Sequence, residues 1–272
     1  MSEIITSPKN EKLRNVSLLQ KKKKARDEQG LFVIEGARIF EDALKSAPER
    51  IEQIFISESF SKSSEWLKIG GKRDSEGKPV FAVNRLEDRA LTVSDDAFVK
   101  ICETVTPQGI LCVMRMKEYS LADIPAKRLL LLENIQDPGN LGTMIRTAEA
   151  AGITGIIMSC GTVDIYSPKV TRSTMGSIFR IPFMYSDNIC DTIDMLKKQG
   201  VTVYGAYLRD GRPYDKVQFK QPCAVLIGNE GNGISDETIA RVSERVFIPM
   251  HGEIESLNAA VAAALLMYRI ED

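Results

Sequence analysis

Apolar and polar residues alternate along the chain in two spacings, one typical of strands and the other of helices. Short continuous apolar runs are typical of strands buried on both faces, and apolar residues at every third or fourth position are typical of helices. From Arg128 onward the two patterns alternate, which predicts a mainly parallel sheet with helices on both faces. The expected strands are 129–133, 155–159, 181–185, 201–207, 223–228 and 245–249, and the expected helices are 140–151, 168–178, 188–199, 236–241 and 256–270.

The N-terminal part of the chain predicts a second, smaller α/β unit. Its first helix, 10–25, has a thin apolar stripe formed by Leu13, Val16 and Leu19, and the rest of that helix is strongly basic. The other expected helices are 38–46, 60–68 and most of 86–103, the expected strands are 31–36, 51–57, 79–83 and 109–114, and a polar loop is expected over 70–78.

The two patterned regions are separated by a stretch in which the pattern weakens. Between Arg115 and Arg128 the sequence is rich in charge and contains Pro125. A chain of 272 residues exceeds the usual size of one domain. We therefore expect an N-terminal domain over 1–116, a linker over 117–127 and a C-terminal domain over 128–272.

Charge is unevenly distributed, although the formal net charge of the chain is only −1. The segment from Lys9 to Arg26 contains eight basic residues and a single acidic one, Glu11. Such a cluster is large enough to contact a nucleic-acid backbone, although a charged helix face can also be merely solvated. The basic residues are Lys9, Lys12, Arg14, Lys21, Lys22, Lys23, Lys24 and Arg26.

Composition narrows the function classes further. The longest apolar tract, Ala259 to Met267, is far too short to cross a bilayer, and the N-terminus has no apolar signal segment, so we expect a cytoplasmic protein without membrane contact. A single histidine, His251, excludes a multi-histidine metal site, and no bound metal is expected. Five scattered cysteines without a CxxC pair are expected to be reduced core residues.

Three polar, glycine-containing runs follow or end expected strands. They are ENIQDPGNLGTMIR (133–146), GNEGNG (228–233) and IPMHGEIESLN (248–258). Because the carboxyl ends of parallel strands meet at one edge of a sheet, these runs are expected to lie together at a ligand-binding edge.

Each run by itself also has an ordinary structural interpretation. Asn140 and Ser256 can cap helices, Asn258 can be a first-turn polar residue, and Glu230 can lie idle in a strand-to-helix turn. Arg146, on an otherwise small and apolar helix, indicates a buried ion pair or an anion site. GNEGNG matches neither a P-loop nor a standard dinucleotide-binding turn.

Taken together, the order and spacing of the three runs resemble the SpoU (TrmH-like) RNA ribose methyltransferases of the SPOUT class. The resemblance covers 128–270, with one small departure at Ala259 and Ala260, where members often have a valine and a serine or a similar pair. The N-terminal part is similar to the ribosomal-protein-like substrate-binding domain of many members, through SPKNEKLRNVSLLQ at its start and TPQGIL at its end.

The resemblance implies an S-adenosylmethionine-dependent transfer of methyl to a ribose 2′-hydroxyl of RNA. It also implies a deep trefoil knot in the C-terminal domain and a homodimer, to which the apolar last helix would contribute. Asn140, Arg146, Glu230, Ser256 and Asn258 match the catalytic positions of the family, and Gly228, Ile248 and Leu257 match the positions that hold the cofactor.

Within this scheme we expect Arg146 to bind a phosphate and to stabilise the developing alkoxide, because a guanidinium rarely gives up its proton. The proton acceptor stays open between phosphate, water and Arg146 itself. Ribosomal RNA, and large-subunit RNA in particular, is favoured as substrate by the N-terminal domain. The alternatives are methylation of tRNA ribose, methylation of a base nitrogen, and a non-catalytic RNA-binding or ribosome-associated protein with the same fold.

Overall fold

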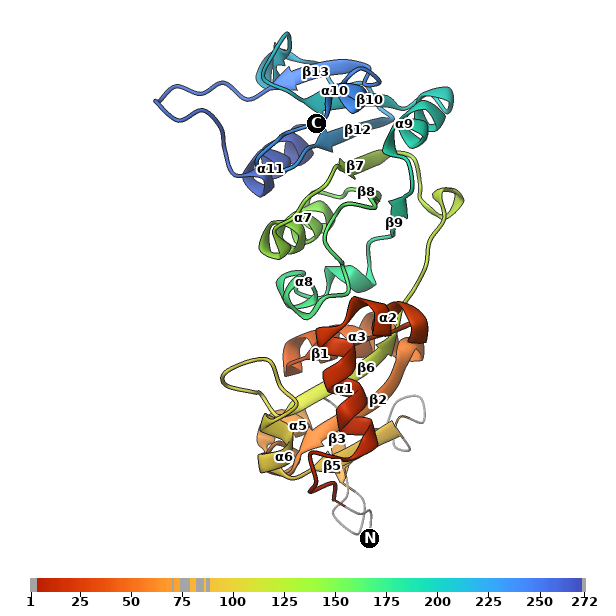
Figure 1. Cartoon of the computed structure of the whole chain (residues 1–272), viewed down its shortest axis with the longest axis vertical. Coiled ribbons are helices and arrows are strands. Elements are labelled where there is room, and N and C mark those ends of the chain that lie inside the picture. Colours follow the sequence, from red (N-terminus) through yellow and green to blue (C-terminus); the bar gives the residue numbers. More distant parts are fainter. Residues whose placement is uncertain (1–3, 70, 74–78, 82–85, 87–88, 271–272) are drawn as a thin grey trace. The chain divides into compact units, whose positions relative to one another are not determined.

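The computed structural model describes residues 4–69, 71–73, 79–81, 86 and 89–270, and the chain divides into two compact units (Figure 1). The first unit is Met1–Lys117 together with Tyr166–Phe179, and the second is Glu118–Ile165 together with Arg180–Asp272. The sequence-based boundaries follow the chain, whereas this division follows contacts in space. The two differ in Tyr166–Phe179, which belongs by its contacts to the first unit.

The first unit is built on a four-stranded sheet in the order β1-β6-β2-β5. Leu13, Val16 and Leu19, the stripe expected on the first helix, are fully buried in its core. The strands are β1 (Leu31–Glu35), β2 (Ile51–Ser57), β5 (Ala90–Val93) and β6 (Ile110–Arg115), with a separate pair β3 (Gly71–Arg73) and β4 (Pro79–Phe81). The helices are α1 (Glu11–Lys21), α2 (Lys23–Gln29), α3 (Ala37–Ser46), α4 (Glu58–Ser61), α5 (Ser64–Lys68), α6 (Asp95–Val99) and α8 (Pro168–Ser173).

Four expectations for this unit are wrong. The single helix expected over 60–68 is two helices, α4 and α5, separated at Lys62 and Ser63. The single helix expected over 10–25 is broken at Lys22, whose backbone is extended (φ −123°, ψ 112°). The region 86–103, expected to be mostly helical, contains β5, because Ala90–Val93 pairs in parallel with β2 and tertiary pairing overrides local pattern. The polar loop expected over 70–78 contains the strand β3 (Gly71–Arg73). Residue 70 and residues 74–78 lie outside the described part of the chain.

The second unit contains a seven-stranded, fully parallel sheet in the order β11-β13-β10-β12-β7-β8-β9, which confirms the expected α/β class. Its strands are β7 (Arg128–Leu132), β8 (Gly155–Ser159), β9 (Phe183–Ser186), β10 (Thr202–Ala206), β11 (Arg212–Pro213), β12 (Cys223–Ile227) and β13 (Glu244–Phe247). Its helices are α7 (Pro138–Ala150), α9 (Ile189–Lys198), α10 (Asp236–Ile239) and α11 (Ala259–Arg269).

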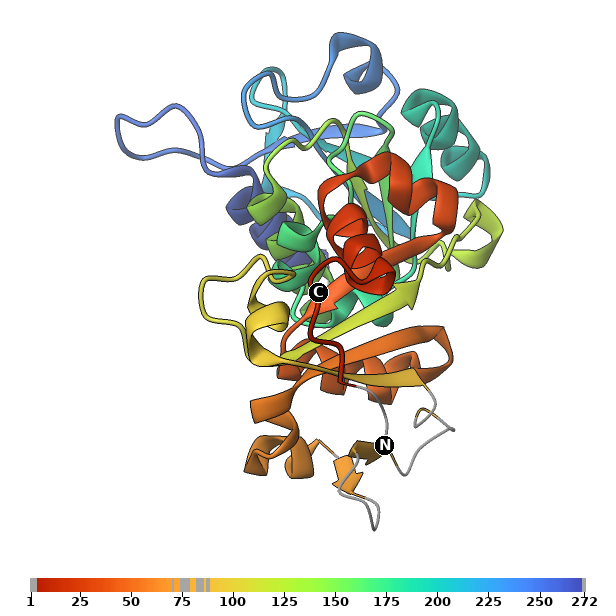
Figure 2. The ribbon, with the colours of Figure 1, turned by 60° about the horizontal axis from the view of Figure 1, so that its bottom comes forward.

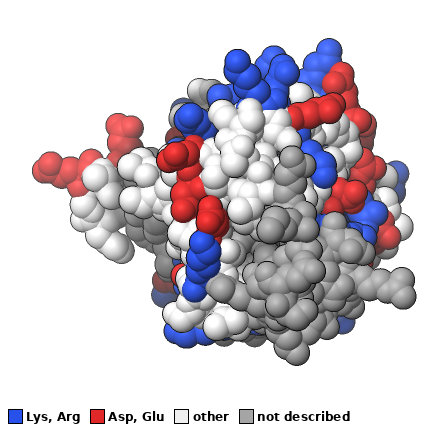
Figure 3. Space-filling model, turned by 90° about the horizontal axis from the view of Figure 1, so that it is seen from below, with Lys and Arg blue, Asp and Glu red and all other residues white. Residues whose placement is uncertain are grey.

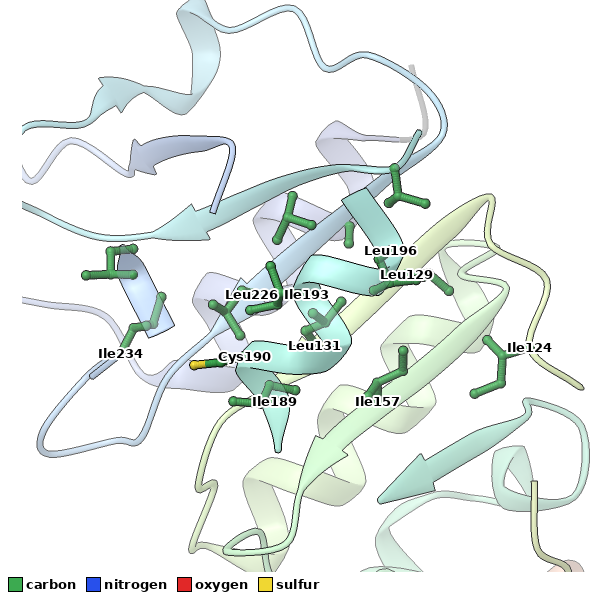
Figure 4. Packing of buried hydrophobic residues seen from close by; sticks show 14 residues of the cluster. Ile124, Leu129, Leu131, Ile157, Ile189, Cys190, Ile193, Leu196, Leu226 and Ile234 are labelled. Atoms are coloured by element: carbon green, nitrogen blue, oxygen red, sulfur yellow. The ribbon is translucent and has the colours of Figure 1, made fainter. Parts of the chain in front are cut away.

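Both faces of this sheet are covered, as the continuous apolar strands require. Leu129 and Leu131 pack with Ile193 and Leu196 of α9 on one face (Figure 4). Because successive side chains of a strand point to opposite faces, Leu130 and Leu132, which are also fully buried, face the other layer, where α7 and α11 lie side by side (Figure 1).

The strand order reverses direction between β7 and β12. β8 and β9 follow β7 on one side, whereas the later strands lie on its other side in the order β12, β10, β13 and β11. In open parallel sheets, ligands bind beyond the carboxyl ends of the strands at such a reversal. The expected position of the polar runs is therefore confirmed at the level of topology, while the deep trefoil knot stays a prediction.

Two further comparisons with the sequence concern cysteines and helix length. All five cysteines are free, and Cys112, Cys190 and Cys223 are buried, but Cys160 is exposed and does not belong to the core. Among the described helices, none is both long and apolar enough to cross a membrane.

Candidate active site

The loops after β7, β12 and β13 gather at the carboxyl edge of the parallel sheet. A cavity of about 520 Å³ lies there, lined mainly by the stretches 206–209, 227–234, 246–248 and 255–257. Gly228, Ile248 and Leu257, the expected cofactor-binding residues, all belong to this lining, as do Glu230 and Ser256. Figures 1 and 2 both show the chain between β13 and α11 extending away from the rest of its unit as a long loop.

The loop 228–233 is folded tightly back on itself. Asn229 and Gly233 exchange two backbone hydrogen bonds of 3.0 and 2.9 Å, and the Asn229 side-chain oxygen accepts from the amides of Gly231 (2.9 Å) and Asn232 (3.0 Å). A Cβ at Gly228 would lie 2.2 Å from the carbonyl carbon of Gly233. Only glycine therefore permits this close backbone approach, which explains the glycine at position 228.

Glu230 is solvent-exposed at this edge, and its carboxylate accepts three hydrogen bonds from the first polar run. Oε2 accepts from the backbone N–H of Gln136 (3.0 Å), and Oε1 accepts from the backbone N–H of Asp137 (3.0 Å) and from Nδ2 of Asn140 (3.0 Å). Partial burial by itself raises the pKa of Glu230, but these donors outweigh it and hold the pKa below its ordinary value. Glu230 is therefore an ionised acceptor rather than an idle turn residue.

Asn140 connects Glu230 to the third polar run. Its side-chain oxygen accepts from Nδ2 of Asn258 at 3.0 Å, so Asn258, Asn140 and Glu230 form one hydrogen-bonded chain. Asn140 is not the cap of its helix, because Asp137 occupies that position and accepts from the Asn140 amide at 2.8 Å.

The beginning of the last helix also differs from the expectation. Asn258, not Ser256, caps α11, and its Oδ1 accepts from the amides of Ala260 (2.9 Å) and Val261 (3.3 Å). Ser256 is exposed in the lining of the cavity.

Arg146 lies apart from this hydrogen-bonded chain. It is exposed on the outer side of α7 with Thr143 and Ala150, and it is not in the cavity lining. No described residue forms an ion pair or hydrogen bond with it, so the buried pair that the sequence allowed is wrong. An exposed, unneutralised guanidinium remains suited to an anion.

The sequence interpretation missed the loop after β10. Leu208 and Arg209 line the cavity, both are exposed, and Arg209 has no hydrogen bond or ion pair within the described part of the chain. The signal was available, because β10 is parallel to β12 and β13 and its carboxyl end must share their edge. The polar run YLRDGR (207–212), which follows β10, is therefore a fourth polar run at this edge.

In the first unit, the basic cluster is only partly available to a ligand. Seven of its eight members are exposed, but Arg26 is 4% exposed and donates to the carbonyls of Leu19 (2.6 Å) and Gln20 (3.1 Å) at the end of α1. Arg26 is therefore a helix-capping residue, and its assignment to RNA contact is wrong. Lys23 pairs with Asp27 at 2.7 Å and Lys24 with Glu28 at 3.7 Å. Figure 3 shows Lys and Arg side chains gathered along the upper edge of one face, with acidic groups beside them.

Fold and site together define an α/β enzyme with a loop-built cavity of ligand size at the reversal point of a parallel sheet. Residues 127–268 match the SpoU rRNA Methylase family, and residues 10–112 match the MRM3-like substrate binding domain. The chain therefore belongs to the SpoU rRNA methylase family, and it is an S-adenosylmethionine-dependent RNA 2′-O-methyltransferase.

Individual relatives resemble the chain over almost its whole length. It is 38% identical over 266 residues to the 23S rRNA (guanosine(2553)-2′-O)-methyltransferase RlmP of Bacillus subtilis, covering 98% of each chain. The AdoMet-bound rRNA methyltransferase of Sinorhizobium meliloti has a TM-score of 0.82 at 26% identity, covering 98% of this chain and 97% of that one. The SpoU methyltransferase AviRb of Streptomyces viridochromogenes, in complex with AdoMet, has a TM-score of 0.80 at 25% identity, covering 96% and 98%.

Proposed function

We propose that this protein methylates a ribose 2′-hydroxyl of large-subunit ribosomal RNA in the cytoplasm. The observation that carries the proposal is the hydrogen-bonded chain Asn258–Asn140–Glu230, which joins the three polar runs beside the cavity. The ribosomal target is supported by the B. subtilis relative, whose name specifies 23S rRNA, and by the match of residues 10–112 to a substrate-binding domain.

S-adenosylmethionine would be held by the lining of the cavity. Gly228, Ile248 and Leu257, which all belong to this lining, would hold the cofactor through their backbone groups. When bound there, the cofactor supplies an electrophilic methyl group. Its site is at the same edge as Glu230 and Ser256, so cofactor and catalytic polar groups are adjacent.

The chemical difficulty of the reaction is the nucleophile, because a ribose hydroxyl is barely ionised at neutral pH. We assign Asn140 and Glu230 to orienting the ribose, since their side chains are fixed by each other and by Asn258. Arg146 binds a neighbouring phosphate and stabilises the alkoxide as it forms, and phosphate or water accepts the proton. Ser256 contacts the substrate rather than capping α11, because Asn258 fills the cap position.

A homodimer accounts for the position of Arg146 and for the surface of α11. Val261, Leu265 and Tyr268 are 48%, 37% and 50% exposed and recur at helical spacing, so they form an apolar stripe. α7 packs beside α11 and exposes Arg146. A two-fold axis through these outer faces would bring Arg146 of one copy against the second copy, which would make the active site a shared one.

The exposed basic residues in and beside α1 and α2 are proposed to hold the RNA through its phosphates, which fixes position without reading sequence. They are Lys9, Lys12, Arg14, Lys21, Lys22, Lys23 and Lys24.

The proposed function is tested by incubating the purified protein and labelled S-adenosylmethionine with unmodified ribosomal RNA and, separately, with tRNA. Label in the large-subunit RNA supports the proposal. Label in tRNA alone would replace it with tRNA methylation, and no label in either would favour a non-catalytic protein.

A further inference from the structure

Asn134, two residues after β7, has a backbone conformation that is unfavourable for most residues. Its φ is +56°, in the left-handed region, where asparagine is tolerated better than other non-glycine residues. Residues held in such conformations cluster at functional sites, where the surrounding contacts impose them. Asn134 does not belong to the lining of the cavity described above and matches none of the catalytic positions, so its conformation needs a separate explanation.

The side chain of Asn134 fastens the loop after β7 to the end of β8. The backbone N–H of Asn134 donates to Oγ of Ser159 at 2.9 Å. The Ser159 hydroxyl in turn donates to the side-chain oxygen Oδ1 of Asn134, also at 2.9 Å. Ser159 is 8% exposed, and its hydroxyl both accepts and donates in this reciprocal pair. Gly161 approaches so closely that a Cβ there would lie 2.0 Å from Oδ1 of Asn134.

The carbonyl of Asn134 extends the connection to the loop after β12. It accepts from Nδ2 of Asn229 at 2.8 Å and from Nε2 of Gln136 at 3.2 Å. Nε2 of Gln136 also donates to the Gly161 carbonyl at 2.6 Å. Through one residue in the left-handed conformation, the loops after β7, β8 and β12 are thus held together.

The direction of two backbone amides further along the same loop, two and three residues after Asn134, depends on this arrangement. The backbone N–H groups of Gln136 and Asp137 both donate to Glu230, at 3.0 Å each. A relaxation of the turn at Asn134 would carry these amides away from the carboxylate, and Glu230 would lose two of the three donors that orient it toward Asn140.

We propose that Asn134 is a positioning residue of the methyl-transfer site: it aims the amides of Gln136 and Asp137 at Glu230 and so fixes the catalytic Glu230–Asn140 pair. The inference rests on the proposed function for its kinetic consequence. Its structural consequence, the orientation of the two amides, is independent of that function.

The test compares Asn134→Gly, Asn134→Asp and Asn134→Ala with the wild-type chain. Glycine keeps the left-handed backbone, the carbonyl and the backbone N–H bond to Ser159, but it loses the side-chain acceptor Oδ1. Aspartate keeps the oxygen acceptor, and alanine loses both the acceptor and the conformational tolerance. We expect kcat to fall about tenfold to a hundredfold in Asn134→Gly and further in Asn134→Ala, and to stay within about threefold of wild type in Asn134→Asp. KM for RNA and the Kd of S-adenosylmethionine should change by less than about threefold in Asn134→Gly, because the bond to Asn229 is retained.

Amide hydrogen exchange supplies a readout that does not require turnover. The Gln136 and Asp137 amides should exchange at least about tenfold faster in Asn134→Gly than in wild type or Asn134→Asp. Asn188→Ala is the matched control, since Asn188 caps α9 in the same unit through bonds to the amides of Cys190 (2.9 Å) and Asp191 (3.3 Å). It should lower Tm while leaving kcat and the exchange of these two amides unchanged.

Unchanged exchange of both amides in Asn134→Gly would overturn the inference. A rise in KM for RNA at constant kcat would also overturn it, because Asn134 would then contact RNA directly. Absence of methyl transfer by the wild-type protein would instead refute the proposed function, and the exchange measurement would still decide the role of Asn134.

Discussion

Nδ2 of Asn140 donates to Oε1 of Glu230 at 3.0 Å, joining residues ninety positions apart in the chain. The first residue lies in the first turn of α7 and the second in the loop after β12. β7 and β12 are neighbouring parallel strands, so the loops that follow them necessarily meet. This bond turns two separate sequence runs into one site.

Replacing the Glu230 carboxylate by an amide should impair catalysis more than cofactor binding. In Glu230→Gln, one of the two carboxylate oxygens becomes an NH₂ group, which cannot accept a hydrogen bond. The Asn140 side chain and the two backbone amides then share a single acceptor oxygen and lose their alignment. We expect kcat to fall about tenfold to a hundredfold and the Kd of S-adenosylmethionine to change less than about threefold. Glu237→Gln, at an exposed position on α10, is the control and should behave as wild type. An equal loss in both variants would contradict the assignment.

The pH dependence should show that Glu230 is not a general base. Its pKa lies below the ordinary 4.5 despite the opposing effect of burial, so the carboxylate is ionised throughout the neutral range. The orienting effect of the carboxylate is therefore present above about pH 4.5 and is lost as the pH falls through the lowered pKa. The ratio of wild-type to Glu230→Gln kcat should be constant between about pH 6 and 9. A ratio that titrates near neutrality would point to a raised pKa and a proton-transfer role.

Arg146→Ala should abolish turnover and leave cofactor affinity nearly intact, because Arg146 is outside the cavity lining. Arg241→Ala, which removes an exposed arginine paired with Asp194, is the matched control and should retain activity. If the active site is shared between two copies, mixing Arg146→Ala with Glu230→Gln should restore part of the activity that each lacks. Near-normal methylation by Arg146→Ala would refute its role, and mixing without recovery would refute the shared site.

Arg209→Ala should weaken cofactor binding. Arg209 is an exposed cation in the cavity lining with no charge partner within the described residues, whereas the methionyl part of S-adenosylmethionine carries a carboxylate. We expect the Kd of S-adenosylmethionine to rise about threefold to tenfold, as measured by calorimetry. Arg212→Ala is the control, because Arg212 lies on the neighbouring β11 and faces Glu244 at 3.7 Å. Equal affinities for wild type and Arg209→Ala would remove Arg209 from the site.

Neutralising Lys21 to Lys24 should weaken RNA binding and flatten its salt dependence. Lys21 and Lys22 have no acidic partner among the described residues, whereas Lys23 and Lys24 are paired. The double variant Lys21→Ala/Lys22→Ala should therefore reduce the slope of log K against log salt by about 1.4, and Lys23→Ala/Lys24→Ala by less. An unchanged slope in the fourfold variant would mean that RNA enters elsewhere.

The sequence predicted the fold of the second unit almost completely, because its strands are buried on both faces and appear as continuous apolar runs such as Leu129–Leu132. It failed where pairing overrides pattern, as at Ala90–Val93, whose strand forms only against β2. Tyr166–Phe179 is a comparable case, since no local signal shows that this segment packs with the first unit.

For the site, the sequence identified which polar runs come together but not what their side chains bond to. A cap assignment requires knowing where a helix begins, and shifts of a few residues exchanged Asn140 for Asp137 and Ser256 for Asn258. The sequence also did not predict whether a single arginine side chain is buried or exposed. Arg146 is exposed where the apolar helix indicated a buried pair, and Arg26 is buried where the basic run indicated exposure.

The central claim is that the methyl group is transferred to a ribose 2′-hydroxyl, and the most direct measurement is the chemical position of the label in methylated large-subunit RNA. Complete alkaline hydrolysis after the reaction separates the two possibilities, because a 2′-O-methyl ribose blocks cleavage of the adjoining phosphodiester. We predict that the label is recovered in alkali-resistant dinucleotides and maps to a single nucleotide. Label recovered in mononucleotides as a methylated base would contradict the account.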